Sequence, residues 1–194
     1  MPTKLLITLL LAVVALLVPT LAPPVHTDGE AQASSDDCLY ENTMPRSSTT
    51  LRRAESATLC LVNRERRARG LRALTRSGTL DSSSRQYAGS MVRQRFFAHV
   101  SPSGGTLVQR IRRQSSYLDR ARRYFVGENL AWGAGSRATP RQTVASWMDS
   151  PTHRANILSP RFRHLGVGLS TGAPRRTGSR SATYVTHFGQ RTLR

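Results

Sequence analysis

The sequence predicts an α+β fold in which helices pack on a small sheet. Apolar residues recur at helical spacing over 51–68, 80–95, 107–114 and 139–158, whereas alternating and β-branched residues dominate 165–170 and 182–188. Helices therefore come first along the chain, and an antiparallel strand pair comes last. This order is typical of α+β domains.

The N-terminal segment, 1–33, has the pattern of a signal peptide. Lys4 is followed by a run of 14 residues, 5–18, that is apolar except for Thr8, and this run is short of the roughly 20 residues that span a bilayer as a helix. Small residues offer cleavage sites after Ala22 or after Ala33. We expect a secreted, extracellular protein; the minor alternative is that the segment is retained as an N-terminal membrane anchor.

The two cysteines, Cys38 and Cys60, are the only pair in the chain. Outside the cytosol a disulfide is the default for such a pair. It would tie the polar linker, 34–50, to the first helix, and closing this loop is worth about 3 kcal/mol on the chain-entropy model. Two free thiols are the alternative.

The first predicted helix, 51–68, is followed by Gly70, a residue typical of helix C-terminal ends. Its arginines fall largely off the apolar stripe, which predicts a solvated charged face. These arginines are Arg64, Arg66, Arg67 and Arg69.

Further helices are expected over 80–95, over 107–114 and from Thr139, an N-cap residue followed by Pro140. Strands are expected over 129–132, 165–170 and 182–188, with a hairpin loop over 175–180. The aromatic residues expected in the core are Phe96, Phe97, Trp132 and Trp147.

The segment 147–158 ends one helix and starts another. Ser150 occupies an N-cap position, and Pro151 follows at the first helical position, where its missing N–H costs nothing. His153 then falls in the first turn of the new helix. A rigid frame of this kind can hold an imidazole at the mouth of a pocket.

Three polar residues lie at predicted element ends: His99, Glu128 and His153. Two imidazoles and a carboxylate can form an incomplete ligand shell for Zn²⁺ or a similar ion. They can equally serve as a general acid/base set without a metal. The alternative is purely structural, with Glu128 cross-linking loops; His164 and His187 are expected to be structural or exposed.

The ordered motifs in 97–102 (Phe-Ala-His-Val-Ser-Pro), 127–131 (Gly-Glu-Asn-Leu-Ala) and 147–158 resemble the bacterial branch of the CAP superfamily. This superfamily comprises cysteine-rich secretory proteins, antigen 5 and pathogenesis-related 1 proteins, also called SCP-like domains. The motifs in 61–66, 166–168 and 188–189 fit the resemblance as well. It implies that 51–194 forms a CAP domain, a three-layer α-β-α sandwich with a small, mainly antiparallel sheet and a central cleft.

The resemblance also implies a cleft tetrad of two histidines and two glutamates that can hold a divalent metal. The histidines fall on His99 and His153, and one glutamate falls on Glu128. The second falls on Ser150, which is no carboxylate, so any Zn²⁺ should bind weakly. Ser150 and Asn129 are the expected ligand-binding residues.

These observations favour an extracellular binding or interaction module whose cleft takes a divalent metal, a small molecule or, by resemblance only, a lipid. A cleft hydrolase, protease- or esterase-like, with His99 or His153 as base is the alternative, and the sequence leaves open whether the protein is an enzyme. A weaker alternative is adhesion to anionic cell-wall or surface polymers, since the net charge is +18 and Lys4 is the only lysine among 29 basic residues. We expect a monomer and no dedicated nucleic-acid partner.

Overall fold

The computed structural model describes residues 37–177 and 179–194, all within one unit of the chain. The predicted signal segment, 1–33, lies outside the described residues, as do the first three residues of the predicted linker. In the described part of the chain, no helix is both long and apolar enough to cross a membrane.

A four-stranded sheet forms the centre of the fold. Its strands are β1 (Thr75–Arg76), β2 (Ala121–Ala134), β3 (His164–Thr171) and β4 (Ser181–Leu193). They lie in the order β1-β3-β4-β2. The β3–β4 and β4–β2 pairs are antiparallel, and β1 is parallel to β3. The sheet is therefore mainly antiparallel, as expected, and β2 is an edge strand.

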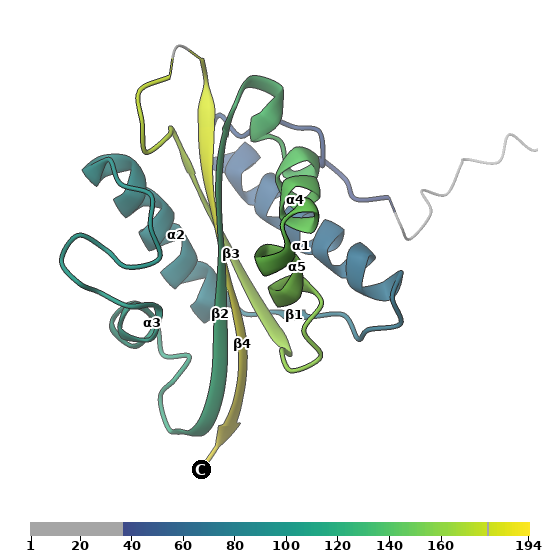
Figure 1. Cartoon of the computed structure of the whole chain (residues 1–194), viewed down its shortest axis with the longest axis vertical. Coiled ribbons are helices and arrows are strands. Elements are labelled where there is room, and N and C mark those ends of the chain that lie inside the picture. The colour runs from purple at the N-terminus through teal and green to yellow at the C-terminus, as the bar shows by residue number, and fades with distance from the viewer. Residues whose placement is uncertain (1–36, 178) are drawn as a thin grey trace, which may run out of the picture. The chain divides into compact units, whose positions relative to one another are not determined.

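Helices cover both faces of this sheet (Figure 1). On one face lie α2 (Gly78–Gln94) and α3 (Leu107–Gln114); on the other lie α1 (Ser48–Arg67), α4 (Pro140–Asp149) and α5 (Pro151–Ile157). The α-β-α sandwich that the resemblance implied is thus confirmed.

The core is divided between the two faces because side chains alternate along the central strand β4. Tyr184 packs in the cluster that contains Leu61 of α1 and Trp147 of α4. Its neighbour Val185 packs against Met91 of α2 on the opposite face. A polar residue between Ser181 and Gly189 of β4 consequently faces one helical layer or the other, and is buried on either side.

Several element bounds differ from the sequence-based expectation. β2 begins eight residues before the predicted strand at Asn129, and β1 is too short to show an alternating pattern. Thr139 caps α4 as predicted, since its side chain accepts a hydrogen bond from the Gln142 N–H. A short 3-10 helix, η1 (Gly135–Ala138), joins β2 to α4.

The predicted solvated face of α1 is wrong at Arg66, which is 1% exposed. Its guanidinium donates to the carbonyls of Arg72 (2.8 Å), Ile157 (2.6 Å) and Ser159 (2.8 Å). The Ile157 carbonyl belongs to the last turn of α5, where backbone oxygens lack partners within the helix. Arg66 therefore joins α1 to the end of α5. Phe97, expected in the core, is instead 40% exposed.

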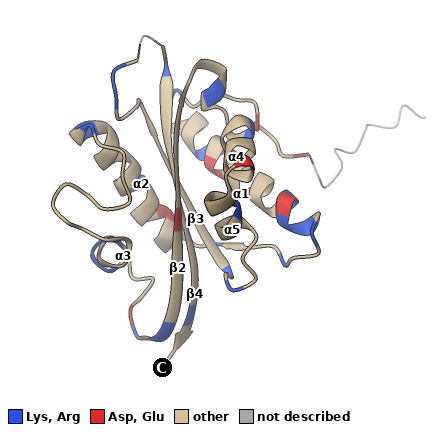
Figure 2. Ribbon diagram, in the orientation of Figure 1, with Lys and Arg blue, Asp and Glu red and all other residues tan. Residues whose placement is uncertain are grey.

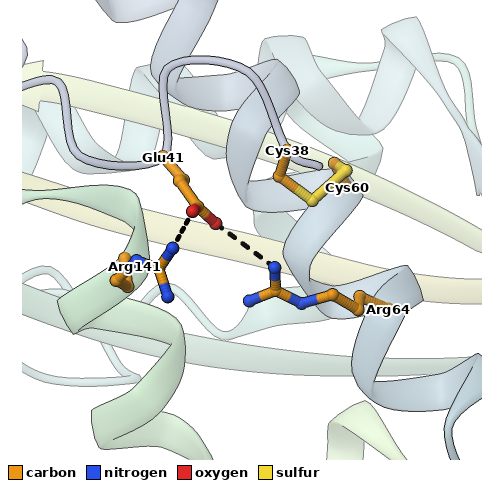
Figure 3. Close-up of a disulfide and its surroundings, with 5 residues drawn as sticks. All are labelled: Cys38, Glu41, Cys60, Arg64 and Arg141. Carbon is orange, nitrogen blue, oxygen red and sulfur yellow. Dashed lines mark hydrogen bonds and ion pairs between the residues drawn. A yellow bond between two sulfur atoms is a disulfide. The ribbon is translucent and has the colours of Figure 1, made fainter. Parts of the chain in front are cut away.

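The predicted disulfide between Cys38 and Cys60 is present and ties the segment before α1 to that helix (Figure 3). Glu41 lies beside it and forms ion pairs with Arg64 of α1, at 3.4 Å, and with Arg141 of α4. The segment that was predicted to be a polar linker is thus fixed against two helices from Cys38 onward.

Candidate functional site

Glu128 is the centre of a buried polar network on β2. Its register partner across the sheet is His187 of β4, whose Nε2 lies 2.9 Å from Glu128 Oε2. Arg110 of α3 donates to the same oxygen at 2.7 Å. His99 Nδ1 lies 2.8 Å from the other oxygen, Oε1. Both carboxylate oxygens are therefore engaged by protein side chains.

The segment that carries His99 is held by its backbone. The Tyr87 hydroxyl donates to the carbonyl of Ala98 at 2.6 Å, and Arg110 donates to the carbonyl of His99 at 2.8 Å. Arg110 also donates to Gly105 at 2.8 Å and stacks on the Tyr87 ring, with its guanidinium carbon 3.5 Å from the ring centroid. The imidazole itself remains 60% exposed. His99 is thus an accessible side chain on a fixed support.

The charges of this network determine the protonation states. Burial alone would raise the pKa of Glu128, but hydrogen bonds from His187 and His99, together with the Arg110 charge, hold that pKa at about 2. The hydrogen bond to Glu128 raises the pKa of His99, whereas burial lowers that of His187. Because a carboxylate only accepts, His99 presents Nδ1–H to it, and the neutral ring leaves Nε2 as a base or ligand atom.

His153 approaches the site from the other side of the edge strand. It lies on α5, and Asn156 of the same helix donates to the backbone carbonyl of Glu128 at 3.1 Å. Asn129, fully buried, accepts from Asn156 at 2.9 Å and donates to the carbonyl of His153 at 3.0 Å. Burial and the charge of His99 lower the pKa of His153. His153 is thus close enough for the charge of His99 to affect its pKa.

Ser150 is the N-cap residue of α5, as predicted, but its side chain makes no capping hydrogen bond. Its hydroxyl lies 3.3 Å from the hydroxyl of Thr152 instead. Pro151 at the first helical position removes one N–H that would have no partner within the helix. Ser150 thus occupies the predicted N-cap position without a side-chain capping bond.

The structure thus brings His99 and Glu128 into direct contact and His153 near to them. Among the described residues, no group of three or more His, Cys, Asp or Glu side chains is placed to hold a metal ion. The metal site at His99, Glu128 and His153 stays a prediction, as do the ligand-binding roles of Ser150 and Asn129. The structure shows Asn129 holding the backbone of His153.

Two members of the network, Arg110 and His187, were not expected from the sequence. His187 was considered structural or exposed, and Arg110 was one arginine of many. No sequence signal distinguished them. The burial of Arg110 beside the exposed Arg112 and Arg113, and of all residues from Ser181 to Gly189 around His187, is visible only in the folded structure.

Comparison with known proteins agrees with this architecture. A model of the cysteine-rich secretory protein (CAP) family matches residues 59–188, which include the whole network around Glu128. The chain belongs to the CAP family. The family assignment that the ordered motifs suggested is thereby confirmed.

This CAP protein is similar to a protein of known sequence from a bacterium. An uncharacterized protein of Bacillus subtilis, YkwD, is 34% identical over 143 residues, or 74% of this chain and 51% of the relative. The chain thus matches about half the length of that relative.

Two solved structures share the fold of the CAP domain. An extracellular SCP-domain protein from Bacillus anthracis has a TM-score of 0.56 at 24% identity, covering 74% of this chain and 44% of its own. An outer surface protein of Borrelia burgdorferi has a TM-score of 0.54 at 22% identity, covering 69% of this chain and 90% of its own. At these identities the likeness concerns the fold alone.

Proposed function

We propose that this CAP protein is an extracellular binding module whose ligand contacts the imidazoles of His99 and His153. One observation carries the proposal: Glu128 uses both oxygens inside the protein, one of them to orient His99, whose ring is 60% exposed. A buried carboxylate that fixes an exposed imidazole is the arrangement found behind metal-ligating and proton-transferring histidines. The signal-like N-terminus supports an extracellular setting.

A divalent metal such as Zn²⁺ is the ligand that this donor set favours. The imidazole nitrogens of His99 and His153 are the ligands available to it, because the oxygens of Glu128 already accept hydrogen bonds from three side chains. Structural zinc sites use four protein ligands and catalytic sites three. Two protein ligands beside the charge of Arg110 should bind weakly. When bound, the metal would supply Lewis-acid chemistry at an exposed position.

Calorimetric titration with ZnCl₂ tests this proposal. We expect wild type to bind with measurable heat and the His99→Ala/His153→Ala double variant to show none. His164→Ala is the matched control, because His164 is an imidazole that contacts Tyr117 outside the site. Equal heats from wild type and the double variant would refute the proposal.

A cleft hydrolase is the second candidate, and the His99–Glu128 hydrogen bond favours it because a carboxylate-oriented imidazole is a general base. Ser150 does not complete a serine triad in this structure, since its hydroxyl is paired with Thr152. The nucleophile would then be water. The measurement is turnover of a chromogenic ester or peptide, which His99→Gln and Glu128→Gln should each abolish and His164→Gln should not. If turnover persisted in both the His99→Gln and the Glu128→Gln variants, this site would not be catalytic and the hydrolase proposal would be refuted.

A further inference from the structure

Arginines gather at one end of the β2–β4 ladder and on the adjoining end of α3 (Figure 2). We call this set the arginine face. Five of its members are exposed, and Arg191 is half-buried. The members are Arg112, Arg120, Arg122, Arg123, Arg191 and Arg194.

Local backbone features bring these side chains together. Ala121 pairs with Leu193 and Arg123 with Thr192, so Arg122 is the extra residue of a β-bulge. A bulge re-aims side chains that a regular strand would send to opposite faces, and here both Arg122 and Arg123 are exposed.

The turn before β2 is also built around this face. Arg120 has a φ of 56°, a left-handed conformation that a non-glycine residue adopts at a cost. Its carbonyl accepts from the N–H of Arg194, which fixes the C-terminal arginine beside it.

The arginine face has no acidic partner in the described part of the chain. None of the ion pairs among the described residues involves its six members, and several exposed arginines elsewhere, such as Arg52 and Arg137, share this property. The carboxylates that arginines engage lie elsewhere, at Glu41, Glu55, Glu65, Asp81 and Glu128. Only Asp119 lies within the stretch 112–123. The local field is therefore strongly positive, which favours an anionic partner.

Aromatic rings support part of this face. The guanidinium carbon of Arg191 lies 4.6 Å from the ring centroid of Tyr117, and that of Arg112 lies 5.8 Å from that of Tyr124. Stacked arginines lose less side-chain entropy when they bind, and their planar forks match phosphate and carboxylate oxygens. A row of such groups suits a chain with repeated charges better than a single small anion.

We infer that the arginine face binds a linear anionic polymer of the cell surface, one that carries phosphate or carboxylate groups at each repeat. This surface is separate from the His99–Glu128 site, so it does not depend on the function proposed there. The net charge alone suggested adhesion to anionic polymers but did not locate it. The arginine face is the surface that would carry this adhesion.

The test compares two triple variants that lose the same charge. Arg120→Gln/Arg122→Gln/Arg123→Gln alters the arginine face. Its matched control, Arg175→Gln/Arg176→Gln/Arg180→Gln, alters three exposed arginines in the β3–β4 loop, before the opposite end of β4.

Binding of the purified chain to inorganic polyphosphate and to polygalacturonate is measured as a function of NaCl, with double-stranded DNA as a third probe. The first two probes distinguish phosphate from carboxylate recognition. Far-UV circular dichroism and thermal unfolding confirm that both variants are folded.

We expect the face variant to lose roughly tenfold or more in affinity for at least one of the first two polymers, and the control less than threefold. The slope of log affinity against log salt should fall by about 2 in the face variant, since three phosphate contacts on a single chain are lost. Equal losses in both variants would show that net charge alone drives binding and would overturn the inference. So would binding of DNA alone, or no loss in the face variant.

Discussion

At the scale of single residues, Glu128 shows how a buried carboxylate becomes a positioning group. An unpaired buried charge is costly, and Glu128 avoids that cost through contacts with Arg110, His187 and His99. Two of these partners are themselves buried, and the third is accessible. The network therefore transmits the fixed position of Glu128 to a side chain that solvent and ligands can reach.

The protonation of the two site histidines is the first prediction. In an NMR titration of the imidazole Hε1 signals, His99 should titrate above its ordinary pKa of 6.5, because Glu128 stabilises its cation. His153 should titrate below 6.5, because of burial and the nearby charge of His99. Between these two pKa values His99 is a cation that donates from both ring nitrogens, whereas the neutral ring of His153 keeps one nitrogen as an acceptor.

Glu128→Gln is the diagnostic variant for this prediction, and it should lower the pKa of His99 because the neutral amide no longer favours the imidazolium. His164, hydrogen-bonded to Tyr117 elsewhere, is the internal control and should keep its pKa. An unchanged His99 pKa in the variant would contradict the proposed role of Glu128.

The motifs at His99, Glu128 and His153 predicted the site, although Glu128 lies in the middle of β2 and not at the strand entry that was expected. His99 and Glu128 prove to be in contact. Arg110 and His187 gain their roles from tertiary packing, since the register of β4 against β2 decides which residue faces Glu128. No local pattern encodes that register.

At the scale of elements, two glycines allow α2 to approach the sheet closely. A Cβ on Gly168 of β3 would lie 2.0 Å from the backbone nitrogen of Arg85 in α2. A Cβ on Gly166 would lie 2.2 Å from the carbonyl carbon of Leu80. Because these atoms belong to backbone or its nearest side-chain atoms, they cannot move without displacing the helix. The Gly-Val-Gly motif is thus a contact between layers.

Gly168→Ala should therefore destabilise the protein by about 1–3 kcal/mol or more, because α2 must shift from β3. Gly78→Ala is the matched control, since a Cβ at Gly78 meets nothing within 4 Å at the start of α2. Both are measured by urea unfolding. A Gly168 variant as stable as the control would mean that the layers are not in tight contact.

Arg66 provides a second prediction for the elements, because it joins α1 to the end of α5 through the carbonyls of Ile157 and Ser159 and also binds that of Arg72. Arg66→Met keeps the unbranched apolar stem of the side chain but leaves these carbonyls without their donor. We expect a loss of about 2–4 kcal/mol in urea unfolding. Arg52→Met, at an exposed position of the same helix, should change stability by less than about 0.5 kcal/mol. If Arg66→Met and Arg52→Met lost the same amount of stability, the hydrogen bonds from Arg66 to the end of α5 would not stabilise the fold.

Sequence reasoning predicted the helices well and the sheet less completely. The apolar periodicity of 80–95 and the N-cap at Thr139 are local signals, and the structure has a helix at each of these places. β2 begins at Ala121, although Arg122 and Arg123 give no strand pattern, because pairing with β4 imposes the strand there. Arg66 was expected in solvent because charge was taken as a sign of exposure, and only the position of α5 explains its burial.

At the scale of the whole molecule, the charge is uneven. The net charge is +18, and the described carboxylates that form ion pairs are concentrated around α1, α2 and Glu128. Mutual repulsion among the remaining arginines opposes folding, most strongly where they gather on the arginine face. Salt weakens such repulsion at the surface, where the screening length is about 10 Å at 0.1 M.

Raising NaCl from about 20 mM to about 300 mM should therefore raise the unfolding midpoint, by about 2–4 °C for each kcal/mol of repulsion removed. Differential scanning calorimetry measures this midpoint. Arg120→Gln/Arg122→Gln/Arg123→Gln should unfold at a higher temperature than wild type in low salt and respond less to added salt, because part of the repulsion is already gone. A midpoint that falls with salt would show that the ion pairs of Glu41, Glu55 and Asp81 outweigh the repulsion. In that case the clustered arginines would not lower the free energy of unfolding of the unliganded protein.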